Sequence, residues 1–181
     1  MSWNDIKASV YASCGALLEP HGFRLIKSRS SYEKVTANGR LMIYFTLVAS
    51  DVGNRFVRTG CGVRNNAIED LFHKTSSTDK RCQSATATIG VSCDKLWVLN
   101  TTEEVAIAIS ELNAYVRDVA LPFLQKKYSL QDFSMLLNTT NTDGRCPYFA
   151  NSIWRCHRGL IAELINPFYF QKFLYSLNLG Y

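Results

Sequence analysis

The sequence has little of what marks fibrous, disordered or membrane-spanning chains. Its 181 residues include only 10 glycines and 4 prolines, and 19% are charged, which excludes a collagen-like or disordered chain. The strongest apolar run, Leu41 to Ala49, is interrupted by Thr46 and is far shorter than the about 18 residues that a membrane span needs. We therefore expect a globular protein with no membrane partner.

The sequence also lacks a CxxC pair, and we expect no secretion signal. The residues that follow Met1 form neither a basic leader nor an unbroken apolar stretch. Without a secretory context, cysteines at irregular spacing are expected to be reduced thiols. We therefore expect a cytoplasmic protein. The six cysteines are Cys14, Cys61, Cys82, Cys93, Cys146 and Cys156.

No catalytic or cofactor motif is present: there is no Gly-x-Ser-x-Gly elbow, P-loop, dinucleotide fingerprint or His-Glu-x-x-His. A zinc site from Cys146, Cys156 and His157 would need a fourth ligand, and adjacent helical residues point about 100° apart. For His157 we favour a core histidine over a catalytic one. The sequence predicts no metal, no cofactor and no enzyme, with a hydrolase-type enzyme of dispersed residues as an alternative.

Apolar periodicity predicts the elements of the N-terminal half. Apolar residues recur at helical spacing from Ile6 to Leu18, and Pro20 with Gly22 ends that pattern. Asn38-Gly39 is the strongest short hairpin signal. The run 41–48 is apolar on both faces, so its strand is expected to be central and covered on both sides. The predicted strands are Phe23–Lys27, Ser31–Ala37, Arg40–Ala49 and Arg55–Arg64.

The C-terminal half is predicted to be mainly helical. Helix-start signals stand at Thr101-Thr102-Glu103-Glu104 and at Ser129, and Pro122 should bend or restart the first of these helices. The predicted elements are helix 66–74, strand 85–92, helices 102–123, 129–137 and 153–164, and a last helix after Asn166-Pro167, with a mobile loop at 138–144. The fold class is α+β: one domain, 1–181, with an N-terminal helix, an antiparallel sheet of about five strands and several C-terminal helices.

One motif resembles a known family. Leu17-Leu18-Glu19-Pro20-His21-Gly22-Phe23, followed by Lys27, Tyr32 and the Asn-Gly hairpin, resembles small bacterial α+β domains in which a helix ends in Leu-x-x-x-Gly-Phe before an antiparallel sheet. Some of these look like immunity proteins of polymorphic toxin systems. The likeness covers residues 5 to 137. It implies a fold and toxin neutralisation, and it supplies no catalytic residue.

A candidate binding site lies on the fourth predicted strand. Alternation places Arg58, Gly60, Gly62 and Arg64 on one face, and glycines two apart leave a shallow trough between two arginines. Such a trough could receive a partner segment. The alternative is that a bulky residue such as Trp97 or Tyr115 fills it from an overlying helix.

Two further segments are candidates for binding. The last predicted helix carries more aromatic surface than one helix face can bury, including Phe168 and Tyr169, and aromatic residues are enriched at interface centres. Phe23-Arg24 with Lys27, Arg29 and Tyr32 could contact RNA by stacking and phosphate pairing. A strand with one solvated face explains the latter residues as well, so nucleic acid is the less favoured partner.

The net charge is +5, and the basic residues are scattered along the chain rather than gathered in a run. Immunity to a nuclease usually demands an acidic face, whereas this charge suits a neutral or acidic partner. The sequence therefore predicts a non-catalytic, protein-binding domain, an immunity protein that neutralises a toxin by stoichiometric binding. An RNA-binding module is the alternative from another class, and the oligomeric state stays open.

Overall fold

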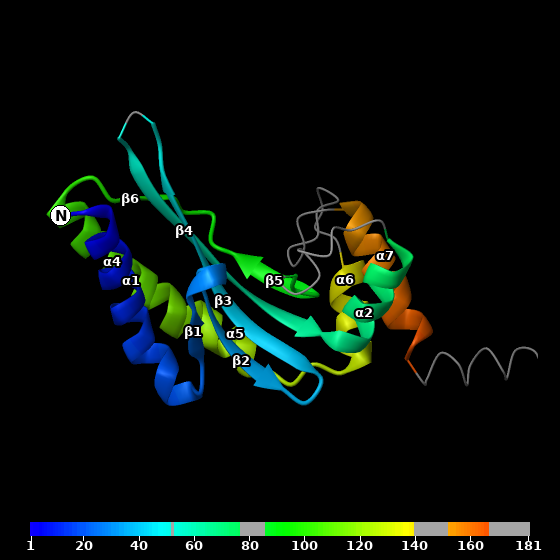
Figure 1. Cartoon of the computed structure of the whole chain (residues 1–181). Coiled ribbons are helices and arrows are strands. Elements are labelled where there is room, and N and C mark those ends of the chain that lie inside the picture. Colours follow the sequence, from blue (N-terminus) through cyan, green and yellow to red (C-terminus); the bar gives the residue numbers. More distant parts are fainter. Residues whose placement is uncertain (52, 77–85, 140–151, 167–181) are drawn as a thin grey trace, which may run out of the picture. The chain divides into compact units, whose positions relative to one another are not determined.

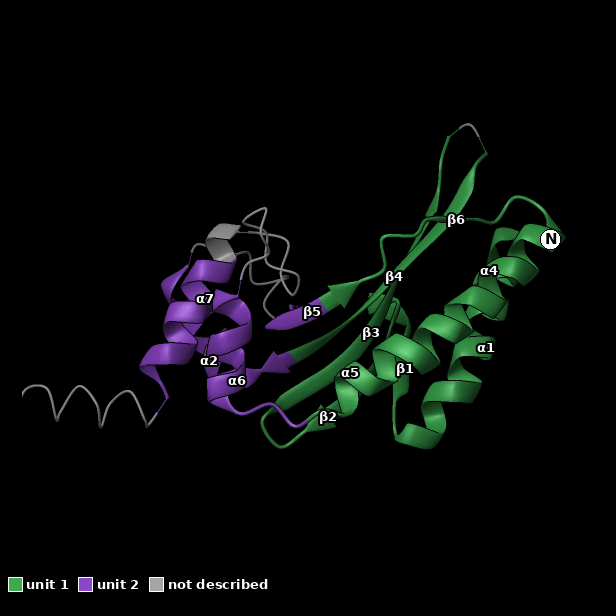
Figure 2. Cartoon of the chain, turned by 180° about the vertical axis from the view of Figure 1, so that it is seen from behind, with its two compact units in different colours: residues 1–63, 91–126 green, residues 64–90, 127–181 purple. Residues whose placement is uncertain are grey.

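The computed structural model describes residues 1–51, 53–76, 86–139 and 152–166. The chain forms two compact units, 1–63 with 91–126 (unit 1) and 64–90 with 127–181 (unit 2), which are described separately below (Figure 2). The single domain stays a prediction, because two compact units can belong to one domain. From residue 140 on, the loop expected at 138–144 lies outside the described residues, as does the last predicted helix beyond Asn166.

The predicted α+β class, with an antiparallel sheet between an N-terminal helix and later helices, is confirmed (Figure 1). The strand order is β1-β2-β3-β4-β5, and β6 pairs with β4. As predicted, β3 is central. Adjacent residues Met42 and Ile43 are both buried, so this part of the strand is covered on both faces. The strands are β1 Arg24–Ile26, β2 Ser31–Thr36, β3 Gly39–Ala49, β4 Arg55–Asn65, β5 Ile89–Ser92 and β6 Trp97–Val98.

The β2–β3 hairpin forms, but its turn is displaced by one residue from the expected Asn38-Gly39. Thr36 pairs with Gly39, so the two residues between the strands are Ala37 and Asn38. The same register sets Tyr32 opposite Ile43, and both side chains are buried. A slip of one residue would move them to the other face of the sheet, so burial of this pair decides the register.

The first helix, α1 Trp3–Leu18, ends in the predicted glycine turn. It begins at a capping box between Ser2 and Asp5 that the sequence analysis missed. A 3-10 turn, Glu19–His21, follows, and Gly22 adopts φ 83°, a left-handed conformation that favours glycine. The amide of Phe23 then donates to the carbonyl of Leu18 at 3.3 Å. Leu-x-x-x-Gly-Phe therefore reverses the chain into β1.

Helices α1, α4 and α5 lie on one face of the unit 1 sheet, here called the helix-covered face (Figures 1 and 2). The predicted capping box of Thr101 and Glu104 opens α4 Thr102–Tyr115. A π-helical turn, Val116–Ala120, leads to α5 Leu121–Gln125, with Pro122 in its first turn, so Pro122 restarts the helix as expected. The Tyr32 hydroxyl donates to the Tyr11 carbonyl at 2.8 Å, which joins β2 to α1.

Unit 2 contains three described helices, α2 Asn66–Thr75, α6 Leu130–Asn138 and α7 Ser152–Leu164. The Asn65 side chain caps α2, and Ser129 with Asp132 forms the predicted cap of α6. Arg155 of α7 donates to the carbonyl of Leu137, and Asn166 donates to Gln131 at 2.6 Å, so two contacts join α7 and the residues after it to α6. None of the helices in the described ranges is long and apolar enough to cross a membrane.

Candidate functional site

The predicted trough is filled at its centre by an aromatic ring. A Cβ built on Gly60 would lie 3.0 Å from Cε2 of Tyr44 and closer still to its hydroxyl. That hydroxyl is hydrogen-bonded to Ser92 at 3.1 Å, which holds the ring over the glycine. The alternative of a filled trough therefore applies here, but the residue comes from the neighbouring strand β3. Trp97 lies in β6, and Tyr115 contacts Cys61 on the helix-covered face.

The other predicted trough residues do not share one environment. Arg58 is exposed in unit 1, whereas Gly62 is buried and Arg64 belongs to unit 2, with a side chain only 6% exposed. The expected pair of flanking arginines is therefore one surface group and one buried group. Phe168 and Tyr169 lie outside the described residues. A role in partner binding stays a prediction for all six residues.

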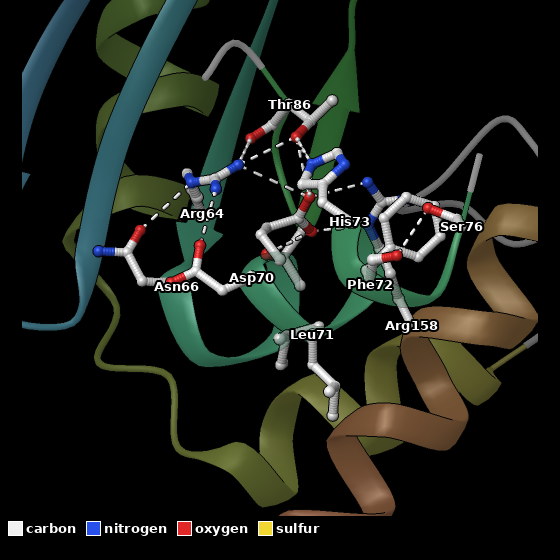
Figure 3. Close-up of polar contacts among 12 residues, drawn as sticks. Arg64, Asn66, Asp70, Leu71, Phe72, His73, Ser76, Thr86 and Arg158 are labelled. Carbon is white, nitrogen blue, oxygen red and sulfur yellow. Dashed lines mark hydrogen bonds and ion pairs between the residues drawn. The ribbon is translucent and has the colours of Figure 1, made fainter. Parts of the chain in front are cut away.

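Arg64 belongs to a buried cluster centred on Glu69 of α2, which no part of the sequence analysis identified (Figure 3). Arg158 of α7 donates from Nε to Oε1 at 2.6 Å and from Nη2 to Oε2 at 2.8 Å, a bidentate fork. Both side chains are fully buried. We call this group the Glu69 cluster. Its members are Arg64, Glu69, His73, Thr86, Thr88 and Arg158.

Hydroxyl groups complete the shell around the carboxylate. Thr86 donates to Oε2 at 2.8 Å and Thr88 donates to Oε1 at 3.0 Å, while Nη1 of Arg64 lies 3.7 Å from Oε2. Glu69 also lies in the first turn of α2, where the helix dipole favours a negative charge. A buried ion pair repays its desolvation only when such additional hydrogen bonds are made. The cluster therefore serves as a clamp between α2, α7 and the residues that precede β5.

His73 is the titratable group at the edge of the cluster. Its Nε2 lies 3.4 Å from Oε2 of Glu69 and 3.1 Å from Oγ1 of Thr86. Burial lowers the pKa of His73 below its ordinary 6.5, and the positive charges of Arg158 and Arg64 lower it too, which together outweigh the attraction of Glu69. The imidazole is therefore neutral at neutral pH, with one ring nitrogen that donates a hydrogen bond and one that accepts.

The structure shows which face of the predicted helix 153–164 is buried. Leu160 and Leu164 are 55% and 65% exposed, whereas Arg158 and Ile161 are buried. The helix forms as predicted, but it turns a charged residue inward because Arg158 must reach Glu69. His157 is half-buried: its Nε2 lies 3.0 Å from Oγ1 of Thr75, and its ring meets Phe72 edge-on at 5.0 Å.

A second buried carboxylate, Glu33, lies in β2 of unit 1. Arg29 forks it with two bonds of 2.7 Å, Ser31 donates at 2.9 Å and Arg40 donates at 3.1 Å. Burial alone would raise the pKa of Glu33, but the hydrogen bonds from Arg29, Ser31 and Arg40 outweigh it and hold the pKa below its usual range. Glu33 therefore stays ionised at neutral pH. A basic residue four positions before an acid is the only sequence signal that could have indicated it.

The described cysteines are free thiols with different surroundings. Cys14 and Cys61 are buried, Cys93 is half-buried and Cys156 is exposed, while Cys82 and Cys146 lie outside the described residues. Burial raises the pKa of Cys61 to about 11, so its thiol is not ionised at neutral pH. Within the described ranges, no group of three His, Cys, Asp or Glu side chains could hold a metal ion.

The structure also places the residues that were considered for RNA binding. Phe23 and Tyr32 are buried, and the Tyr32 hydroxyl is bonded to α1, so neither ring is available for a stacked base. Arg24 remains exposed, and Arg29 is held by Glu33.

Comparison of the chain with protein-family models, curated proteins and solved structures finds no match.

Proposed function

We propose that this protein acts by stoichiometric binding to another protein, as an immunity protein that neutralises a bacterial toxin. The observation that carries the proposal is the state of the two buried carboxylates of the described residues. In Glu33 and in Glu69, both oxygens accept hydrogen bonds from an arginine fork. A general base needs a free oxygen within reach of a substrate proton. These two carboxylates therefore favour a structural role over a catalytic one.

The segment from Leu18 to Phe23, with the hairpin after it, resembles immunity-like domains. This resemblance supports the proposal of toxin neutralisation. The positive net charge of +5 favours a neutral or acidic toxin over a nuclease. An exposed arginine such as Arg58 suits this role, because arginine is enriched at protein interfaces.

The test is co-expression of the chain with the protein encoded beside it, over a range of expression ratios. We expect growth to be restored only when this chain at least equals its target in copy number, and the two to co-elute as one complex in gel filtration. Protection by far fewer copies would indicate turnover and would replace the proposal with an enzyme. The absence of both protection and complex formation would contradict it.

A further inference from the structure

The face of the unit 1 sheet opposite its helices carries a group of arginines. Cross-strand partners in an antiparallel pair have their side chains on the same face. Arg24 of β1 stands opposite Glu33 of β2, and Arg40 of β3 stands opposite Val35 of β2, so these residues share the face of Glu33. Arg29 reaches the same face because it forks Glu33.

The fourth strand adds Arg58 to this group. Ser31 pairs with Tyr44, which places Tyr44 on the Glu33 face, and the Tyr44 ring covers Gly60. Residues alternate along a strand, so Arg58 lies on the same face as Gly60. The next residues on either side, Val57 and Thr59, are buried on the helix-covered face. We call Arg24, Arg29, Arg40 and Arg58 the arginine face.

The charge on this face is unbalanced. Four guanidinium groups stand against one carboxylate, since Glu33 is the only acid among the described β1–β4 residues that register and alternation place there. Arg29 and Arg40 are engaged by Glu33. The guanidinium groups of Arg24 and Arg58 are exposed and make no hydrogen bond or ion pair within the described part of the chain.

Exposed apolar side chains accompany these cations. Val35 of β2 is 84% exposed and Val48 of β3 is 48% exposed, and both are an even number of positions from Glu33 and Tyr44 in their strands. An interface between proteins combines arginine with apolar groups, whereas binding of single-stranded nucleic acid combines cations with exposed stacking rings. The two rings that register and alternation place on this face, Tyr44 and Phe56, are half-buried, which leaves less ring surface for a stacked base.

We propose that the arginine face is the docking surface for an acidic protein segment, one that presents carboxylates to Arg24 and Arg58 and apolar side chains to Val35 and Val48. This inference rests on the proposed function and names its surface. Arginine binds carboxylates through a planar fork, and the Arg29–Glu33 pair already shows that geometry on this face. All basic residues that register and alternation place on this face of β1–β4 in unit 1 are arginines. Lys34 lies on the opposite face and donates to the His21 carbonyl.

The experiment measures binding of the full chain to a fluorescent peptide of alternating Val and Glu, with an alternating Val and Lys peptide and a single-stranded RNA oligonucleotide as comparison probes. We expect the acidic peptide alone to bind, with affinity that falls as salt rises. Arg24→Gln with Arg58→Gln should weaken it at least tenfold. Arg117→Gln with Lys126→Gln removes the same charge from other exposed positions and should change affinity less than twofold.

Far-UV CD and the melting temperature must match between the two variants, so that a loss of binding is not a loss of fold. No binding of the acidic peptide, or equal weakening in both variants, would overturn the docking surface. Tighter binding of the RNA would assign the face to nucleic acid instead. A face variant that loses the peptide yet still protects cells would refute the surface and leave the proposed function standing, whereas a wild-type chain that binds the peptide without protecting would do the reverse.

Discussion

Arg158 donates two hydrogen bonds, of 2.6 and 2.8 Å, to Glu69, a residue 89 positions earlier in the chain, and its guanidinium also lies 3.7 Å from the centre of the Phe72 ring. One arginine therefore joins α7 to α2 through both an ion pair and a cation–π contact. Thr86 and Thr88 donate to the same Glu69 carboxylate, so the clamp is a network rather than a single pair.

The first prediction concerns this clamp. Arg158→Met leaves Glu69 buried without its fork, so we expect a loss of about 3–5 kcal/mol in the free energy of unfolding. Arg117→Met, which breaks an exposed ion pair of 2.8 Å, should leave the free energy of unfolding nearly unchanged, because solvent screens such a pair. Denaturant unfolding followed by CD measures both. The double variant Arg158→Met, Glu69→Met should recover part of the loss. An Arg158→Met variant as stable as Arg117→Met would contradict the role of Arg158 in the clamp.

The second prediction concerns Gly60. Gly60→Ala places a methyl group in the volume of the Tyr44 ring, so the ring, which is hydrogen-bonded to Ser92, must move. Overpacking of this kind costs about 1–3 kcal/mol. In a Tyr44→Ser background the same substitution should cost much less, since the ring is gone. A double-mutant cycle on thermal unfolding measures the coupling, and additive effects would show that Tyr44 does not occupy this space.

The third prediction is a pH dependence set by His73. Because its folded pKa is lowered below 6.5, the unfolded chain binds more protons between the two values, and stability rises with pH across that window. This contribution is fully present above about pH 6.5 and is lost as pH falls toward the lowered folded pKa. His73→Gln should flatten the slope of unfolding free energy against pH, whereas His21→Gln, at an exposed position, should keep it. An unchanged slope in His73→Gln would exclude this residue as the cause.

The fourth prediction concerns thiol reactivity. Among the four cysteines that the structure describes, a thiol reagent should modify Cys156 first in the folded protein, because it is exposed, and should reach Cys14 and Cys61 only on unfolding. Burial raises the pKa of Cys14 to about 12 and that of Cys61 to about 11, which keeps both as unreactive thiols. Cys156→Ser should lower the number of thiols that react in the folded protein by one. The denatured, unreduced chain should titrate as six thiols, and four or fewer would indicate disulfides.

Much of the local structure could be predicted because its signals are short. Thr101 with Glu104 and Ser129 with Asp132 are capping pairs three residues apart, and each opens a helix as expected. The Gly22 turn is likewise decided by its own backbone conformation. Strand β6 escaped notice because two residues, Trp97 and Val98, carry no periodicity and are strands only through their pairing with β4.

Local sequence patterns could not predict what fills the trough or that Glu69 is buried. The trough was inferred from alternation within β4, which places Val57 and Thr59 on the opposite face of the strand, where both are buried. What covers Gly60 depends on the register between strands, and that register brings Tyr44 to it. Glu69 carries no local sign of burial, since its arginine partners lie at positions 64 and 158.

Caps, turns and apolar periodicity act over a few residues, so they are enough to predict most of the helices, the order of the longer strands along the chain and an antiparallel sheet. Contacts between residues far apart in the chain decide which face of α7 turns inward and which arginines remain exposed. A buried charge is tolerated only when its partners arrive from elsewhere in the chain. Arg158 is therefore inside and Leu160 outside, against the order that hydrophobicity alone would give.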